Sequence, residues 1–316
     1  MASSKPMVIA AILGNLAVAV TKFIAAGMTG SSAMLTEGLH SVSDTGNGVL
    51  LLVGLRVSRR PPDTQHPFGH GKELYFYTLL VAMLVFGVGG GISIYEGILH
   101  VLRPEPMTHV VANYVVIALA AGFEGASWAV ALKGFRRVQA GRSAWQTVRS
   151  SKDPTTFAVL FEDSAALIGL AVAAAGIFLA DHLRMPVLDG AASIVIGVLL
   201  CAVATVLLRE TKALLVGEAA SPRVIRDVLE AAAADPAVDE IGRVMTMHLG
   251  PEEILLNLDV AFEPDLSSAE LATAVRRLER AIRRAEPRVR HIFIEAGGAG
   301  AGTGNSRDEA GDGPAP

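Results

Sequence analysis

The chain has 316 residues, of which 51% are hydrophobic and 18% are charged, and its mean hydropathy is +0.45 with a formal net charge of −4. Its single cysteine, Cys201, lies in an apolar run, which excludes a disulfide framework and a cysteine-based metal site. The basic residues form no stripe suited to nucleic acid. Apolar runs fill the first part of the chain and charge returns after about Glu210, which predicts a membrane domain followed by a small soluble domain.

Six apolar stretches are each long enough for a membrane-spanning helix of about 20 residues. In chain order they are Met7–Gly27, Ser31–Ser58, Leu74–Leu102, His109–Leu132, Pro154–Ala180 and Val187–Leu208. The first is expected to be a retained span, because the N-terminus lacks a charged segment followed by a cleavage site.

Basic residues cluster after the second, fourth and sixth stretches, for example at Arg59, Arg136 and Arg209. Positive charge marks the cytoplasmic side, so both termini are expected in the cytoplasm. The Ala- and Arg-rich composition, with no transit peptide, favours a bacterial cytoplasmic (inner) membrane.

The pattern changes after residue 215. We expect a helix from Ser221-Pro222 to about Ala234, strands at Ile241–Leu249 and Ile254–Phe262, a helix capped by Ser267 and Glu270 that ends near Ala285, and a strand at Val289–Ile294. The predicted fold is an α-helical membrane protein with six transmembrane helices, followed by a small α+β domain of order αββαβ. The expected boundaries are 1–215 for the membrane domain, 216–296 for the cytoplasmic domain and 297–316 for a disordered tail.

The second stretch carries a polar stripe made by Glu37, His40, Asp44 and Asn47. Their spacings of three, four and three place them on one face of a helix. An ionisable group at the bilayer centre costs at least about 2.5 kcal/mol unless it has a partner. A histidine with carboxylates is a good ligand set for a divalent metal. The alternative is a buried polar pair that fastens two helices.

The fifth stretch supplies Glu162 and Asp163, which could meet this stripe near the midplane because the two helices are antiparallel. Neighbours on a helix point about 100° apart, so both are not expected to be ligands. Glu162 is expected to turn away from the ligand face, as a proton carrier, a supporting group or a substitute ligand. This donor set suits Zn²⁺, Fe²⁺, Co²⁺ or Mn²⁺ better than Cu⁺.

Other charged residues in the apolar stretches are expected to have structural roles. Glu96, Glu124 and Asp189 are interpreted as groups that form hydrogen bonds between helices, and Lys22 as the counter-ion of a carboxylate. In the loop after the second stretch, Asp63, His66 and His70 could converge on one metal ion. The alternative for that loop is a tight, solvated turn.

Four features carry a resemblance to a known family. They are the segments LTEGLHSVSDTGN at 35–47, HPFGHGK at 66–72 and LDGAASIVIG at 188–197, and the αββαβ domain. Together they resemble the cation diffusion facilitator family of divalent-metal/proton antiporters. The resemblance implies six spans, a homodimer and a tetrahedral transport site made by the second and fifth spans.

By this resemblance His40, Asp44 and Asp163 are ligands of the transport site, and Asp63, His66 and His70 match the family's loop site. The chain departs from the family at Val159, where many members have His or Asp. The segment FEDSAALIG at 161–169 is similar to a subgroup of the zinc transporter 9 type, with Glu-Asp on the fifth span. In the cytoplasmic domain only His248, Asp259, His291 and Glu295 could bind metal, and a site there is expected to be absent or weak.

The expected function is efflux of a divalent cation, with zinc favoured, by secondary transport coupled to proton antiport. Metal binding requires deprotonated ligands, so one site can exchange metal for protons. The cation is the substrate and no prosthetic group is expected; the expected partners are cations, protons, the lipid membrane and a second copy of the chain, with no nucleic acid. The alternative is an intramembrane metal-dependent hydrolase, which is disfavoured because no His-Glu-x-x-His pattern occurs. A metal sensor is a third possibility.

Overall fold

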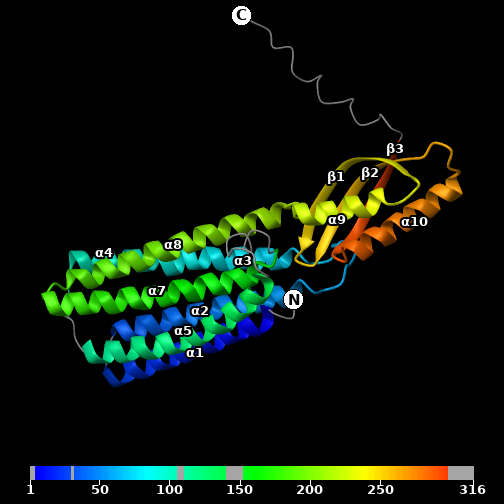
Figure 1. Ribbon diagram of the computed structural model, residues 1–316. Coiled ribbons are helices and arrows are strands. Elements are labelled where there is room, and N and C mark those ends of the chain that lie inside the picture. The colour runs from blue at the N-terminus through cyan, green and yellow to red at the C-terminus, as the bar shows by residue number, and fades with distance from the viewer. Residues whose placement is uncertain (1–3, 30–31, 105–109, 140–151, 298–316) are drawn as a thin grey trace, which may run out of the picture. The chain divides into compact units, whose positions relative to one another are not determined.

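The computed structural model describes residues 4–29, 32–104, 110–139 and 152–297 (Figure 1). Side chains at 4, 25–26, 28–29, 32–40, 110 and 137–139 lie outside the described part, as do residues 298–316 of the tail predicted at 297–316. The chain divides into two compact units, Met1–Val216 and Gly217–Pro316. Each unit is described by itself.

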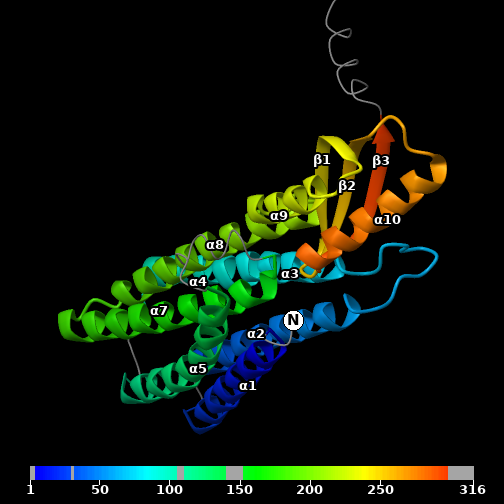
Figure 2. The ribbon, with the colours of Figure 1, turned by 45° about the vertical axis from the view of Figure 1, so that its right-hand side comes forward.

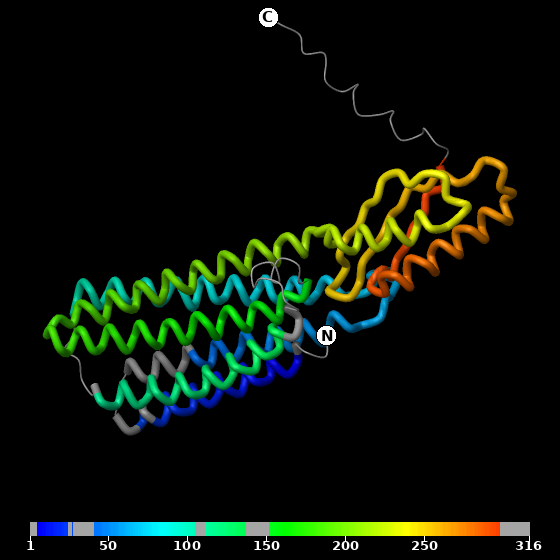
Figure 3. The backbone as a smooth tube through the Cα atoms, viewed as in Figure 1, coloured from blue at the N-terminus to red at the C-terminus, as the bar shows by residue number. Residues whose placement is uncertain are grey.

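The first unit is helical. Its elements are α1 (Ser4–Thr29), α2 (Ser32–Val57), α3 (Glu73–Leu84), the π-helical segment η1 (Val85–Gly91), α4 (Ile92–Leu102), α5 (Val110–Gln139), α7 (Pro154–Leu183) and α8 (Val187–Val216). Figure 3 shows α3, η1 and α4 as one continuous rod. Among the described residues, five helical segments are long and apolar enough to cross a membrane. The second predicted span is the 26-residue helix α2, and α5 and α8 continue beyond their predicted ends.

Local sequence signals set the ends of α7. The Asp153 side chain accepts a hydrogen bond from the backbone N–H of Thr155, and Pro154 occupies the first helical turn, as predicted. The helix stops at Arg184, which adopts a left-handed conformation with φ of 56°. These signals fix the register of the helix that carries Glu162 and Asp163.

Glycines bring α4 against α8, which lie side by side in Figures 1 and 2. A Cβ atom on Gly97 would lie 2.7 Å from the carbonyl oxygen of Gly190, and one on Gly190 would lie 2.8 Å from that of Gly97. Gly90 and Gly197 repeat this reciprocal contact at 3.0 and 2.8 Å. Two backbones therefore touch along this seam, where the small residues allow the helices to pack closely.

Gly97→Ala is expected to destabilise the protein by about 1–3 kcal/mol, because the added methyl group meets backbone atoms that cannot rotate away. Gly122→Ala on α5 is the matched control, since nothing lies within 4 Å of its added Cβ. Thermal unfolding of both purified variants in detergent measures the difference. Equal midpoints for the two variants would show that the seam does not contribute to stability.

The second unit consists of α9 (Pro222–Ala233), β1 (Val238–Gly250), β2 (Glu253–Phe262), α10 (Ser268–Ala285) and β3 (Val289–Gly297), which is the predicted αββαβ order. The sheet order is β1-β2-β3, with β1 antiparallel and β3 parallel to β2. Alternate residues of β2 are buried against both helices: Ile254, Leu256, Leu258 and Val260 on the strand, with Val228, Leu278 and Ile282 opposite. The predicted capping box of Ser267 and Glu270 is present.

An ion pair joins α10 to the turn that follows α9. The Arg277 guanidinium donates two hydrogen bonds to the Asp235 carboxylate, at 2.6 and 3.0 Å. These bonds hold the pKa of Asp235 below its usual range. His248 is 1% exposed, and its Nδ1 lies 3.3 Å from the carbonyl oxygen of Gly250.

Candidate metal sites

A cavity of about 370 Å³ lies inside the first unit. Its polar lining comes from Asn15 and Lys22 on α1, Ser41, Ser43, Asp44 and Asn47 on α2, Ser93 and Glu96 on α4, Glu124 on α5, and Glu162 and Asp163 on α7. Residues of η1 and α8, such as Val88 and Leu200, supply apolar walls. Two segments far apart in sequence therefore face one space, through Asp44 and Asn47 of α2 and the carboxylates of α7.

Asp163 is held by α5. Its side chain is 3% exposed, and its Oδ2 accepts a hydrogen bond of 2.8 Å from the Ser127 hydroxyl. One residue further along both helices, the Trp128 ring N–H donates to the Ser164 hydroxyl at 2.9 Å. These two contacts fix the rotation of α7 against α5, and with it the direction of the Asp163 carboxylate.

Glu162 faces α2 and lines the cavity, whereas it was expected from the sequence to turn away from the ligand face. The Asn47 amide donates to Glu162 Oε1 at 3.5 Å, and both residues line the cavity. The 100° between neighbouring residues directs Asp163 to α5 and Glu162 to α2, so the cavity receives both carboxylates. The other amide atom, Asn47 Oδ1, is buried and has no hydrogen-bond donor among the described residues.

The α2 stripe is only partly described. Asp44 and Asn47 line the cavity, whereas the side chains of Glu37 and His40 lie outside the described residues. The backbone of His40 is helical and one turn before Asp44, a spacing that places both residues on one face. Beside them, the Lys22 ammonium donates a hydrogen bond of 3.0 Å to the buried Ser41 hydroxyl.

Val159 precedes Asp163 by one turn but belongs to the hydrophobic core. It is 2% exposed and does not line the cavity. Glu124, interpreted from the sequence as a hydrogen-bonding group between helices, instead faces the cavity, and no described side chain donates a hydrogen bond to it. The sequence indicates that Glu124 lies within an apolar span, but it does not indicate which way that helix is rotated.

The loop between α2 and α3 brings Asp63, His66 and His70 together. Asp63 Oδ1 lies 3.3 Å from His66 Nδ1, and Asp63 Oδ2 lies 3.4 Å from His70 Nε2. One potential ligand atom from each residue falls within 4.8 Å of the others. The turn is tight because Gly69 has φ of 82° and its N–H donates to the His66 carbonyl at 2.9 Å.

Asp63 is suited to remain ionised. The backbone N–H of His66 donates to its carboxylate at 2.7 Å, and this bond together with that from Gln65 holds the pKa of Asp63 below its usual range. One carboxylate and two imidazoles form a zinc-type donor set with a fourth position open.

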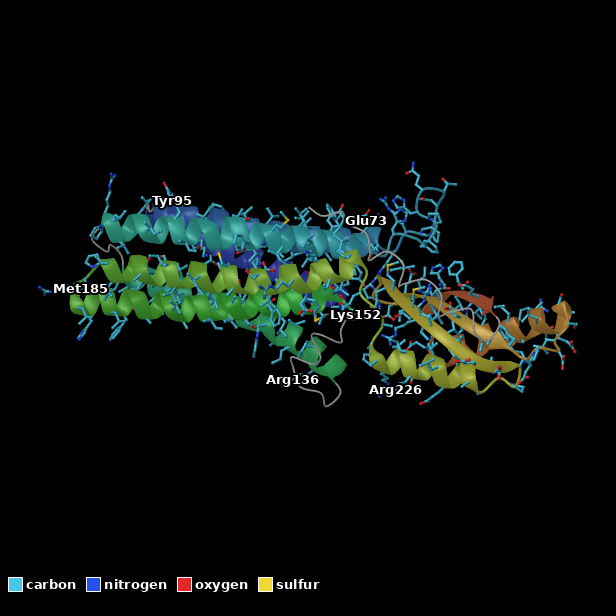
Figure 4. All side chains as sticks on the ribbon, turned by 90° about the horizontal axis from the view of Figure 1, so that it is seen from above. Glu73, Tyr95, Arg136, Lys152, Met185 and Arg226 are labelled. Atoms are coloured by element: carbon cyan, nitrogen blue, oxygen red, sulfur yellow. The ribbon has the colours of Figure 1, made fainter. Side chains whose placement is uncertain are left out.

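Two of the basic residues lie at one end of the helical unit. Figure 4 shows Arg136 and Lys152 at the end of the bundle opposite to Met185, which lies in the turn between α7 and α8. Glu73, at the start of α3 and directly after the loop, lies at the same end as Arg136 and Lys152. The loop cluster and the basic residues therefore share one end.

Residues 8–216, nearly the whole of the first unit, match the family model described as the cation efflux transmembrane domain. The chain belongs to this cation efflux family. It is a multi-pass integral membrane protein, and the predicted resemblance to the cation diffusion facilitators of the zinc transporter 9 type is confirmed.

Relatives of the cation efflux chain include the proton-coupled zinc antiporter SLC30A9, mitochondrial, of Xenopus laevis, which is 34% identical over 244 residues, or 77% of this chain and 44% of that protein. The Homo sapiens protein of the same name is 33% identical over 244 residues, or 77% and 43%. Metal tolerance protein C4 of Arabidopsis thaliana is 32% identical over 261 residues, or 82% and 57%. The chain spans about half the length of these relatives.

Proposed function

We propose that the protein exports divalent metal cations, with zinc as the favoured substrate, in exchange for protons. The observation that carries this proposal is the cavity in a cation efflux domain, where Asp44 and Asn47 of α2 meet Glu162 and Asp163 of α7. Carboxylates gathered at membrane depth attract a divalent cation or protons, because unpaired charge there is costly. The names of the relatives, which specify proton-coupled zinc antiport, support the same substrate and coupling.

In this mechanism His40, Asp44 and Asp163 hold the metal, and Glu162 acts beside them. The ligands must lose their protons before the cation binds, so each binding event releases protons from the site. Exposure of the cavity first to one side and then to the other makes the exchange a transport cycle. Membership of a cation efflux family disfavours the alternative function, an intramembrane metal-dependent hydrolase.

We further propose that the chain works as a homodimer with both termini in the cytoplasm, on the side of Arg136 and Lys152. A bacterial inner membrane remains our proposed location, whereas the relatives from Xenopus laevis and Homo sapiens are called mitochondrial. The domain boundaries proposed from the sequence place the membrane part at 1–215 and the cytoplasmic part at 216–296.

Uptake into sealed proteoliposomes tests the function. With protein inserted in both orientations, Zn²⁺, Mn²⁺, Co²⁺ and Fe²⁺ are offered outside, and the lumenal pH is recorded. We expect metal accumulation together with proton movement in the opposite direction. Metal-dependent hydrolysis of peptides or lipids in detergent, without metal accumulation in vesicles, would instead support the hydrolase.

The loop makes a separate prediction. We propose that Asp63, His66 and His70 bind a second metal ion outside the transport path, so Asp63→Ala with His66→Ala should remove one metal equivalent and leave residual transport. Elemental analysis after equilibrium dialysis measures the stoichiometry. Gln65→Ala is the matched control, because Gln65 donates its hydrogen bond to Asp63 from the backbone N–H, which alanine retains. An unchanged stoichiometry in the double variant would mean that the loop binds no metal.

A further inference from the structure

Two carboxylates that line the cavity, those of Glu96 and Glu124, have no part in the transport site described so far, and Glu124 is the more buried of the two. Glu124 of α5 is 9% exposed and lines the cavity with Asp44, Glu162 and Asp163. Within the described ranges no side chain donates a hydrogen bond to it. A buried carboxylate without such a donor is costly. This cost is offset if the Glu124 carboxylate binds a cation in the cavity.

The helix α5 directs Glu124 toward the space that Asp163 enters. Ala120 and Glu124, one turn apart, both line the cavity, and Ser127, three residues later, donates its hydrogen bond to Asp163. Residues three apart on a helix have Cβ atoms about 5–6 Å apart. Glu124 and Asp163 also interact electrostatically, as do Glu124 and Asp44. The carboxylates of α2, α5 and α7 thus surround one volume.

The fifth span offers no ligand one turn before Asp163, because Val159 is part of the core. The described lining of the cavity offers carboxylate, hydroxyl and amide oxygens, among them the buried Asn47 Oδ1, which lacks a hydrogen-bond donor in the described part of the chain. Oxygen donors suit harder divalent cations such as Mn²⁺ as well as Zn²⁺. An additional oxygen ligand from α5 fits this environment.

We propose that Glu124 is a direct ligand of the transported divalent cation, so that the site is built by α2, α5 and α7. This inference rests on the proposed transport function. It also gives Glu124 a role in selectivity, because a further carboxylate favours cations that accept several oxygen ligands over those that need imidazole.

The alternative, in which Glu124 only balances the charge of a nearby cation, leads to a different expected result. Glu124 also interacts electrostatically with Lys22, the cation that donates a hydrogen bond to Ser41. If Glu124 only balanced that charge, removing both charges together would restore metal binding. If Glu124 is a ligand, the double variant stays defective, because the missing oxygen is not replaced.

The test uses the full chain carrying Asp63→Ala and His66→Ala, so that the loop contributes no metal binding. Calorimetric titration with Zn²⁺ and with Mn²⁺ gives the affinities, and the visible absorption of bound Co²⁺ reports the ligand set. Glu124→Gln is expected to weaken binding at least about 10-fold, more for Mn²⁺ than for Zn²⁺, and to change the Co²⁺ spectrum. Glu124→Asp keeps the carboxylate, so its affinity for each metal should lie between that of the parent protein and that of Glu124→Gln. Glu210→Gln, a half-buried glutamate of α8 outside the cavity lining, is the control.

Two results would overturn the inference while leaving the transport function intact. One is an unchanged affinity and Co²⁺ spectrum in Glu124→Gln. The other is full recovery of binding in Lys22→Met with Glu124→Gln. If the parent protein with Glu124 intact binds no divalent cation, the proposed function and the inference fail together.

Discussion

Asp44→Asn is expected to reduce metal transport at least about 100-fold while the protein stays folded. The carboxylate of Asp44 lies in the cavity, half-buried, at the position where α2 faces α7. Asparagine has nearly the same shape, so the packing of α2 against α1 and α3 is retained, but the negative charge that attracts a divalent cation is lost. His40→Ala, one turn earlier, should have an effect of similar size.

Uptake in proteoliposomes measures this loss, and thermal unfolding in detergent confirms that the variant is folded. Ser193→Ala is the matched control, because within the described ranges the Ser193 hydroxyl donates only to the Asp189 carbonyl of its own helix, and Ser193 does not line the cavity. Normal uptake by folded Asp44→Asn protein would remove α2 from the transport site.

The second large effect concerns the neighbours on α7. Asp163→Asn is expected to reduce transport about 100-fold, and Glu162→Gln only about 10-fold. Asp163 is 3% exposed and its direction is fixed by Ser127, so an amide there leaves a buried neutral group where a cation must bind. Glutamine at 162 can still accept the hydrogen bond from Asn47, so it keeps the contact with α2.

Initial rates of Zn²⁺ uptake, normalised to the amount of reconstituted protein, decide the order. Ser127→Ala is a third variant for this comparison. It removes the hydroxyl that orients the Asp163 carboxylate but keeps the carboxylate, so the transport rate should fall less than in Asp163→Asn. The opposite ranking, with Glu162→Gln inactive and Asp163→Asn normal, would assign the metal to Glu162.

The sequence predicted the elements better than it predicted their rotation. Apolar length identifies spans because every span must cross the same thickness, and Asp153-Pro154 and the Ser267–Glu270 pair locate helix starts because capping is local. The π-helical geometry of Val85–Gly91 was not predicted. Its hydrogen-bond pattern depends on tertiary contacts that no local pattern records.

For the candidate site too, the sequence predicted which residues share a helix face but not how the helices are rotated against one another. The spacing of Asp44 and Asn47 places them on one face from sequence alone, and the short loop spacing brings Asp63 near both of its histidines. The direction of Glu162 and the inward face of Glu124 could not be predicted, because each depends on which helices pack against α5 and α7 and at what rotation. Polar residues on three different spans meet only through that packing.

Simultaneous recording of metal and proton flux tests the central claim most directly. Proteoliposomes containing the wild-type chain or Asp44→Asn are loaded with a zinc-sensitive and a pH-sensitive dye, and Zn²⁺ is added outside. We expect zinc entry matched by proton exit in the wild type, and loss of both fluxes in Asp44→Asn. Zinc entry without proton movement in the wild type, or undiminished coupled flux in Asp44→Asn, would contradict this claim.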